Sequence, residues 1–328
     1  MTFAVAPKVV AFPRVGAIEG AAKPFKPQGP GLVLMGGKVD VQAAFKWMQE
    51  TLVGGKGIKG GDLVVLTAAS DNFRDAEISA SANFDSVRTI RIEPGASAAE
   101  KADAAKLIRE ADAVFMGGGD QAKYLRWGPA IHSAIQGVFD DGGVVGGTSA
   151  GLAVLGEHVF GAQQGGVGPK EAVADPAMSK LELTPGFLKL PQLEGTVTDT
   201  HFAERNRLGR MIALMARQLE SGSPIVRAIG VDEGVAVVVD KNGVGRVLKQ
   251  GDAEGGAHLA QMGNGDLEPL TPGKALTANV RVRHVLTADE PFQLWSAPTT
   301  WGRVAVVDGK LPAGAVARYG FEVDGFDD

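Results

Sequence analysis

Residues 143–151 read GVVGGTSAG, a short apolar run that passes directly into a glycine-rich turn. The run Gly143–Gly146 predicts a buried strand, and we expect a helix to begin after Ser149. The same order of strand and helix recurs along the preceding residues. Buried apolar strands that alternate with helices indicate an α/β fold, with a mostly parallel sheet sandwiched by helices.

The regions on either side of this stretch extend the pattern. Upstream, the expected strands are 31–37, which ends in two glycines, 62–69, 87–92 and 113–116, and the expected helices are 41–53, 74–85, 98–110 and 124–141, the last interrupted at Gly128-Pro129. Downstream, the sequence predicts loops with short strands over 161–192, a helix over 205–221, a β-hairpin from 235–239 and 244–248, and short strands that end near 304–307. We therefore expect an irregular N-terminal arm over 1–29 and a single α/β domain over 30–328, with a β-rich C-terminal extension over about 251–328.

Composition excludes several classes of partner and cofactor. The net charge is −5 and no clustered basic run occurs, so no nucleic-acid partner is expected. No apolar stretch reaches the ~18 residues that a membrane span needs, so no membrane partner is expected. The chain has no cysteine, which excludes a thiolate zinc site and a cysteine nucleophile. No cluster of metal ligands is seen in the sequence, and no cofactor is expected.

The N-terminal residues Met1–Gly20 do not have the pattern of a signal peptide. Their short apolar runs are broken by Pro7, Pro13 and Arg14, and no basic start precedes a continuous apolar segment. We therefore expect a cytoplasmic protein, with secretion as the alternative if a leader once preceded this sequence.

The pentapeptide Gly147-Thr148-Ser149-Ala150-Gly151 matches the G-x-S-x-G pattern of a nucleophile elbow. Such a turn between a strand and a helix lifts the serine hydroxyl clear of the sheet, and small neighbours are needed because the backbone is crowded there. The following amide, that of Ala150, would point at a developing oxyanion. The alternative is a glycine-rich turn in which the serine only caps a helix. The position between a strand and a helix favours the nucleophile.

His201 is the best candidate for the base that a serine nucleophile needs. It stands in Asp199-Thr200-His201-Phe202, which is followed by Arg205, Arg207 and Arg210. These guanidinium groups suit bidentate binding of carboxylates. The alternatives are a histidine that bonds to the backbone at the start of a helix and arginines on a solvated helix face.

An acid that could orient this histidine occurs in Gly230-Val231-Asp232-Glu233-Gly234. The alternative is an ordinary turn at the end of a strand. The chain order of the candidates is Ser149, His201, Glu233, whereas an α/β-hydrolase has its histidine last. The order therefore argues against the α/β-hydrolase fold.

Together these residues resemble the cyanophycinases, a group within the serine peptidases of family S51 that also contains aspartyl dipeptidase (peptidase E). The resemblance covers about residues 31–250 and rests on motifs in the family's order: Val114–Gln121, Gly146–Gly151, Asp199–Phe202 with Arg205, Arg207 and Arg210, and Gly230–Glu233. It implies a fold similar to that of the class I glutamine amidotransferases, which is flavodoxin-like. The chain departs from the family pattern at Thr200, where glutamine is usual, and at Leu152, where alanine is usual.

The resemblance implies a catalytic triad and an oxyanion hole. Ser149 would be the nucleophile, His201 the base and then the acid, and Glu233 the third member of the triad. The oxyanion would meet backbone amides at Gly118 or Gly119 and at Ala150.

The resemblance also implies a substrate and the residues that hold it. Gln121 would line the substrate pocket, and Asp199 and Arg205 would hold charged groups of the substrate. Arg207 and Arg210 would do the same or would brace the site. The implied substrate is a peptide or the polymer cyanophycin, a poly-aspartate backbone with arginine on each β-carboxyl, and the products would be β-Asp-Arg dipeptides. The resemblance further implies a homodimer.

Two alternatives stay open at this point. The first is a peptidase E-like dipeptidase that acts on aspartyl or isoaspartyl peptides, and the second is a non-catalytic binding protein on the same fold. The Asp232-Glu233 pair downstream of His201 favours the cyanophycinase arrangement over the first. The joint presence of Ser149, His201 and Glu233 argues against the second, because a pure binding protein needs no triad.

Overall fold

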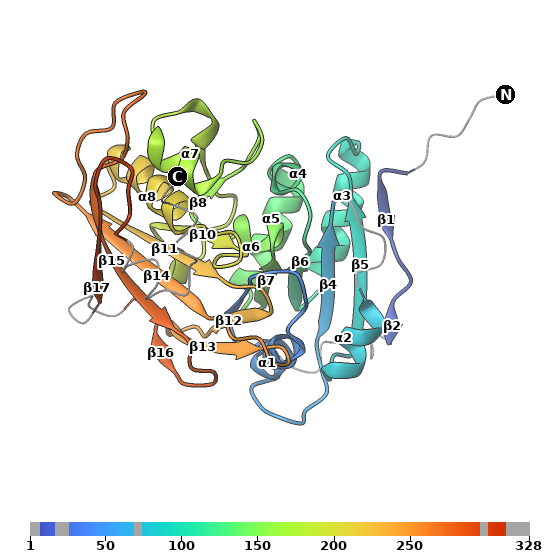
Figure 1. The fold of residues 1–328 in the computed structure, drawn as a ribbon. Helices are drawn as coiled ribbons and strands as arrows, with labels where there is room; N and C mark the ends of the chain where they lie inside the picture. Colours follow the sequence, from blue (N-terminus) through green and yellow to red (C-terminus); the bar gives the residue numbers. More distant parts are fainter. Residues whose placement is uncertain (1–6, 17–25, 69–73, 296–300, 313–328) are drawn as a thin grey trace. The chain divides into compact units, whose positions relative to one another are not determined.

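The computed structural model describes residues 7–16, 26–68, 74–295 and 301–312 (Figure 1). The chain divides into two compact units. Unit 1 consists of residues 1–33 and 42–151, and unit 2 consists of residues 34–41 and 152–328. The first crossing between the units therefore falls within strand β3 (Gly31–Met35). The prediction of a single domain over 30–328 stays a prediction.

The sheet of unit 1 is mostly parallel, as the sequence predicted. Its strand order is β1-β5-β4-β6-β7-β3, where β1 is Val9–Ala11, β4 Asp62–Thr67, β5 Ser86–Ile92, β6 Ala113–Met116 and β7 Val144–Thr148. Strand β4 pairs in parallel with β5 and β6, and β6 pairs in parallel with β7. The short strands β1 and β2 (Val15–Gly16) are antiparallel to β5, so the arm expected to be irregular contains two short strands.

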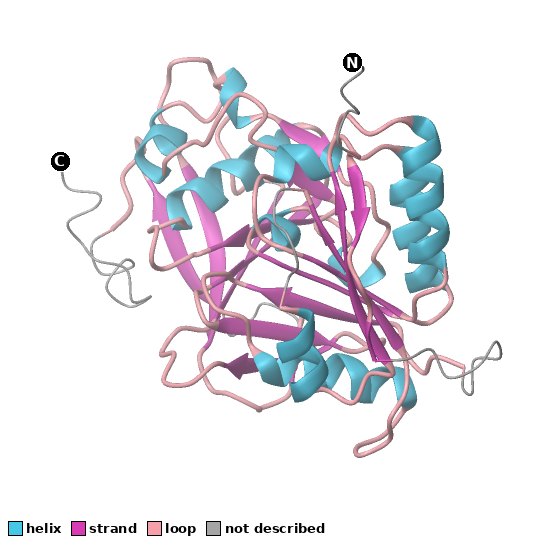
Figure 2. Cartoon of the chain, turned by 90° about the vertical axis from the view of Figure 1, so that its right-hand side faces the viewer, coloured by secondary structure: helices cyan, strands magenta, loops and turns pink. Residues whose placement is uncertain are grey.

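The helices of unit 1 follow its strands along the chain. They are α1 (Gln42–Val53), α2 (Asp75–Ser81), α3 (Ala98–Arg109), α4 (Gln121–Leu125) and α5 (Pro129–Asp140). Helix α1 packs on α2, and α3 packs on α5. Right-handed crossovers between parallel strands put α2 on one face of the sheet, and α3 and α5 on the other, because the strand order reverses after β5. The mixture of helices and strands (Figure 2) confirms the predicted α/β class.

Unit 2 is rich in β structure and is also mixed. Its larger sheet has the order β17-β15-β14-β11-β10-β8-β9. These strands are β8 (His158–Phe160), β9 (Leu183–Pro185), β10 (Thr196–Thr200), β11 (Ile225–Val231), β14 (Ala257–Gly263), β15 (Ala278–Val285) and β17 (Gly302–Val306). Strand β10 is parallel to β8 and β11, whereas β14, β15 and β17 follow in antiparallel order. The predicted hairpin is β12 (Val235–Val239) with β13 (Val244–Lys249), and β16 (Phe292–Gln293) pairs with β13.

Helix α8 (Leu208–Glu220) forms the centre of the core of unit 2. It packs on β10, β11 and β14 and on helix α7 (Pro169–Ala174). Two predictions differ from this structure. The helix expected from Arg205 begins at Leu208, because the backbone amide of Arg207 donates to the carbonyl of Phe202 (2.9 Å) and the preceding residues form turns. The stretch expected to hold only loops and short strands contains α7, which begins with Pro169 at a position where the missing amide is not needed.

No helix within the described ranges is long and apolar enough to cross a membrane.

Gly151 provides a test of the close packing in unit 1. A Cβ at this position would lie 2.0 Å from the carbonyl oxygen of Met116, which is backbone and cannot rotate away. We expect Gly151→Ala to lower the free energy of unfolding by about 1–3 kcal/mol or more, as overpacking usually does. The matched control is Gly166→Ala, since no heavy atom lies within 4 Å of a Cβ there. Urea unfolding followed by circular dichroism measures both, and equal midpoints would contradict the packing described.

Candidate active site

Ser149 lies in a strained turn of unit 1, between β7 and the short helix α6 (Ala150–Ala153). Its φ angle is 51°, in the left-handed region that few residues other than glycine adopt. The turn closes because both flanking positions are glycine: a Cβ on Gly147 would lie 2.4 Å from the carbonyl carbon of Gly151. Ser149 is half-buried, whereas the strand before it is buried throughout. This is the local geometry of a nucleophile elbow.

A glycine loop, Gly117–Gly119, follows β6 at the same edge of the sheet as Ser149. The parallel register pairs Met116 with Gly147, so the residues that follow each strand leave the sheet together. A Cβ on Gly118 would lie 3.6 Å from the Cβ of Ser149. The predicted oxyanion residues Gly118, Gly119 and Ala150 therefore belong to the same small region as Ser149.

Tyr124 orients the peptides of this loop. Its buried hydroxyl lies 2.7 Å from the carbonyl oxygen of Gly117 and 3.0 Å from that of Gly118. Because the C=O and N–H of one trans peptide point in opposite directions, the amide of Gly119 points away from Tyr124. Gln121, predicted to line the substrate pocket, is the first residue of α4 and is half-buried.

His201 and Glu233 form a hydrogen-bonded pair in unit 2. Strands β10 and β11 are parallel and pair Thr200 with Val231, so His201 and Glu233 leave the sheet at neighbouring positions. His201 Nδ1 lies 2.7 Å from Glu233 Oε1. His201 is only 7% exposed, and its φ of 45° is again in the left-handed region. The structure thus brings together the two members of the predicted triad that belong to unit 2.

Burial, helped by two neighbouring positive charges, lowers the pKa of His201 and favours its neutral imidazole. Burial lowers the pKa of His201, the hydrogen bond to Glu233 raises it, and the positive charges of Arg205 and Arg207 lower it again. The outcome is a pKa below the ordinary value of a histidine. For Glu233, burial raises the pKa, but hydrogen bonds from His201 and Lys38 outweigh burial and hold it below its usual range. With Glu233 ionised, Nδ1 is the donor and Nε2 is the nitrogen that can accept a proton.

Lys38 is a contact of this pair that the sequence analysis did not identify. Its Nζ lies 3.0 Å from Glu233 Oε2, the carboxylate oxygen that His201 does not use. Lys38 directly follows Gly36-Gly37, which was interpreted only as the turn after a strand. The signal in the sequence was a cation immediately after a glycine pair at the carboxyl end of a predicted strand.

Asp199 is buried and is held by two of the three predicted arginines. Arg210 donates to both of its carboxylate oxygens, and Arg207 Nη1 donates to Oδ1 at 3.0 Å and to the carbonyl oxygen of Thr200 at 2.7 Å. Burial raises the pKa of Asp199, and the charges of Arg210 and Arg207 lower it by more, so that the carboxyl is ionised. This cluster braces the end of β10. The prediction that Asp199, Arg207 and Arg210 contact a substrate stays a prediction.

Arg205 differs from the other two arginines. It is exposed, and its guanidinium has no hydrogen-bond or ion-pair partner among the residues that the structure describes. It lies one turn beyond His201, since its backbone amide donates to the carbonyl of His201 at 3.1 Å. Of the three arginines, Arg205 is the one whose charge is not already engaged by Asp199.

Asp232, the neighbour of Glu233, has a separate structural task. It is 1% exposed and accepts hydrogen bonds from the amides of Ala203 (2.8 Å) and Gly256 (2.7 Å) and from His258 Nε2 (2.8 Å). The adjacent acids are therefore used differently: Asp232 ties the turn after His201 to the sheet, and Glu233 faces the imidazole.

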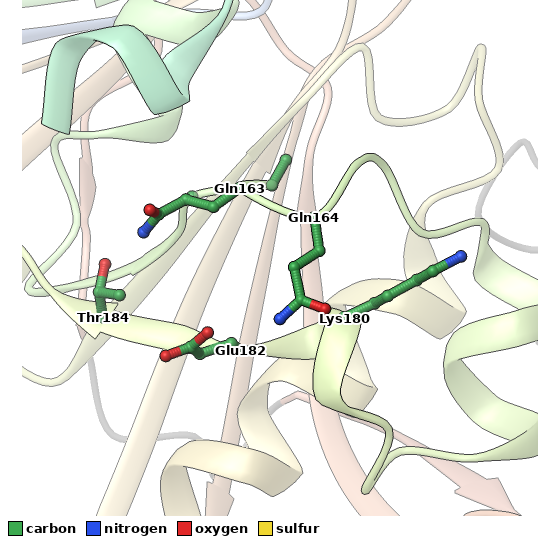
Figure 3. Close-up of a pocket in the computed structure, with 7 residues that line it drawn as sticks. Gln163, Gln164, Lys180, Glu182 and Thr184 are labelled. Atoms are coloured by element: carbon green, nitrogen blue, oxygen red, sulfur yellow. The ribbon is translucent and has the colours of Figure 1, made fainter. Parts of the chain in front are cut away.

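A small pocket in another part of unit 2 does not contain these residues (Figure 3). It is lined by Gly161, Ala162, Gln163, Gln164, Lys180, Glu182 and Thr184, and the side chain of Gln164 points toward the segment that carries Lys180. Within the described ranges, no group of three or more His, Asp or Glu side chains is arranged to hold a metal ion.

Comparison with known families identifies the family of this chain. A family model of peptidase family S51 matches residues 83–247, about half of the chain. The chain belongs to peptidase family S51. This membership confirms the family resemblance found in the sequence.

The relatives of this member of family S51 include cyanophycinases. It is 32% identical over 156 residues to the cyanophycinase of Synechococcus elongatus. The aligned residues make up 47% of this chain and 44% of that cyanophycinase. It is 30% identical over 190 residues to the cyanophycinase of Trichormus variabilis. The aligned residues make up 56% of this chain and 57% of that cyanophycinase. The chain thus spans about half the length of the cyanophycinases it matches. Among solved structures, a peptidase from an acI-B1 Actinobacterium matches with a TM-score of 0.47 and 16% identity, over 82% of this chain and 98% of that chain.

The charges around His201 predict opposite effects for two neutral substitutions. Glu233→Gln removes the negative charge that raises the pKa of His201, so the pKa should fall further. Arg205→Gln removes a positive charge, so the pKa should rise toward its ordinary value. NMR titration of the His201 ring signals measures both, with Arg246→Gln on the exposed side of β13 as the control. Shifts of the same sign in the two variants would contradict the electrostatics described.

Removing the charge of Asp199 should destabilise unit 2. Asp199→Asn keeps the shape of the side chain but leaves the charge of the buried Arg210 uncompensated, which usually costs about 3–5 kcal/mol. The control is Asp103→Asn, which breaks an exposed pair with Lys106 and should change stability by less than about 1 kcal/mol. Urea unfolding of the two variants checks this, and an equal loss in both would show that the Asp199 cluster is not a brace.

Proposed function

We propose that this chain is a serine-type hydrolase of the cyanophycinase type. It cleaves amide bonds of cyanophycin, multi-L-arginyl-poly-L-aspartate, and releases β-Asp-Arg dipeptides. Ser149 is the nucleophile, His201 the general base and acid, and Glu233 the residue that orients His201. The observation that carries the proposal is the 2.7 Å hydrogen bond between His201 Nδ1 and Glu233 Oε1 in a member of peptidase family S51.

The first step is attack on the scissile carbonyl. His201 Nε2 takes the proton of the Ser149 hydroxyl as the oxygen forms a bond to the carbonyl carbon, and the imidazolium that results is stabilised by Glu233. The lowered pKa of His201 supports this role, because a base must be unprotonated at the working pH. The reaction requires Ser149 and His201 to come within hydrogen-bond reach of each other.

The tetrahedral intermediate carries a negative oxygen, which needs fixed donors. Backbone amides at Gly118 or Gly119 and at Ala150 supply them, and Tyr124 supports this assignment because it holds the carbonyls of the glycine loop in one orientation. His201 then gives its proton to the leaving amine, and the Ser149 ester remains. A water molecule, deprotonated by His201, hydrolyses the ester and restores the enzyme.

The charges near His201 support a substrate that carries carboxylates. Asp199 already engages Arg207 and Arg210, whereas Arg205 is exposed and suits a substrate carboxylate. Glu204 is also exposed, and its Oε1 accepts a hydrogen bond from the backbone amide of Glu233 at 3.0 Å. Its carboxylate suits a substrate guanidinium. A polymer with both groups on each repeating unit matches this pair of charges.

Release of β-Asp-Arg from purified cyanophycin tests the proposal. We expect turnover by the wild type, a loss of about 10⁴-fold or more in Ser149→Ala because the nucleophile is removed, and unchanged turnover in the control Ser133→Ala on the exposed side of α5. Release by neither wild type nor Ser149→Ala, together with cleavage of small aspartyl or isoaspartyl peptides, would replace the polymer by a dipeptide substrate. Equal release by both would refute Ser149 as the nucleophile.

A further inference from the structure

The turn Gly36-Gly37-Lys38 contacts both members of the His201–Glu233 pair. It follows β3 and belongs to unit 2, like the pair itself. In the sequence it is only the glycine-rich end of an apolar run, and the proposed mechanism assigns it no task. Its contacts with the pair come from all three of its residues.

The two glycines contact His201 at its backbone and at its ring. The carbonyl of Gly36 accepts a hydrogen bond from the amide of His201 at 3.0 Å. A Cβ on Gly37 would lie 2.5 Å from the Cε1 and 2.6 Å from the Nε2 of His201, so the backbone of Gly37 lies directly against the imidazole. Gly37 also has a φ of 114°, which side chains rarely adopt. Only glycine allows the turn to touch the reactive edge of the ring.

The lysine contacts the acid of the pair. Lys38 Nζ donates to Glu233 Oε2 at 3.0 Å, while His201 Nδ1 donates to Oε1 at 2.7 Å. Each oxygen of the carboxylate thus has its own donor, the Lys38 ammonium for Oε2 and the His201 imidazole for Oε1. Two separate donors restrict rotation of the carboxylate. Lys38 has a φ of 69°, and a left-handed lysine persists only where its surroundings hold it.

We propose that the turn Gly36–Lys38 positions the catalytic pair, with Lys38 as the positioning residue that holds Glu233 toward His201. The inference rests on the proposed function, because it assigns a role within the same reaction. Gly37 sets the plane of the imidazole by contact, Gly36 holds the backbone of His201, and Lys38 keeps Oε1 of Glu233 directed at Nδ1.

The exposure of Lys38 separates positioning from stability. The Lys38 side chain is 69% exposed, and ion pairs with an exposed partner add little to folding stability. Removing the Lys38 ammonium should therefore leave the unfolding midpoint unchanged while it frees the Glu233 carboxylate to rotate. Removal of a residue with a purely structural role would instead lower the unfolding midpoint and leave kcat unchanged.

The charge of Lys38 also provides a spectroscopic readout. Lys38 is one of the groups that lower the pKa of Glu233, so its removal should raise that pKa. The other charged or titratable groups around the pair are Glu204, Arg205, Arg207 and Asp232, with His258 bound to Asp232. These groups are unchanged in a Lys38 variant, so a shift in the titration of Glu233 reports on Lys38 alone.

The experiment compares Lys38→Met, Lys38→Arg and the control Lys106→Met, which breaks an exposed ion pair with Asp103 on α3. A 1 Å misplacement of reacting groups can cost about 10²-fold in rate, and for the loss of one tether we expect kcat to fall roughly 10-fold with KM unchanged. Lys38→Arg should recover most of kcat, because it restores the cation. Lys106→Met should match the wild type. Carboxyl ¹³C titration of Glu233 should show a raised pKa in Lys38→Met and not in the control.

Two results would overturn the inference. One is a Lys38→Met variant with wild-type kcat and an unchanged Glu233 titration. The other is a folded Gly37→Ala variant with wild-type kcat, because an added Cβ must displace the imidazole if the contact with His201 is as described. If the wild type cleaves no substrate, the proposed function fails, and the Glu233 titration of Lys38→Met against Lys106→Met still decides whether Lys38 holds the carboxylate.

Discussion

The parallel pairing of β10 with β11 is the constraint on which the His201–Glu233 pair depends. The register sets Asp199 beside Gly230 and Thr200 beside Val231, so the next residues of both strands emerge at one edge of the sheet. An antiparallel pairing would send the two chain segments to opposite ends. The pairing also needs Gly230, because a Cβ there would lie 2.3 Å from the ring of Phe202, which follows His201. One strand register therefore fixes the position of the histidine, its acid and the packing beneath them.

Close approach of backbone segments is the second requirement of the candidate site. Ser149, His201 and Lys38 all have left-handed backbone conformations, and such residues persist only where the surroundings hold them. The surroundings here are backbone contacts that only glycine permits. A Cβ on Gly151 would meet the carbonyl of Met116 near Ser149, and one on Gly37 would meet the imidazole of His201. Glycine is therefore required at Gly151 in unit 1 and at Gly37 in unit 2.

The buried charges near His201 differ from the exposed ones in what they bind. The buried Asp199 is paired with Arg207 and Arg210, and the buried Asp232 accepts hydrogen bonds from His258 and from two backbone amides, so both carboxylates serve the structure. Arg205 and the ammonium of Lys38 lie near the surface, and Lys38 pairs there with the Glu233 carboxylate. The positive charges of Arg205 and Arg207 also help keep His201 neutral, which is the state a general base requires. Arg207 takes part in both, because it binds Asp199 and also helps to lower the pKa of His201.

The sequence by itself determined the order and type of most elements, because apolar periodicity and glycine turns are local properties. It predicted β6 at residues 113–116 and the hairpin of β12 and β13, and it identified family S51 from its motifs. It missed α7 and placed the start of α8 three residues early, since turn geometry near His201 depends on distant contacts. It named Ser149 and His201 as candidates by residue type and position, and Glu233 by the resemblance to cyanophycinases. Only the tertiary structure decided that Glu233 and not Asp232 faces His201, that Asp199 engages Arg207 and Arg210 but not Arg205, and that Lys38 contacts Glu233. These contacts join residues far apart in the chain, and strand pairing and burial, which no local pattern encodes, bring them together.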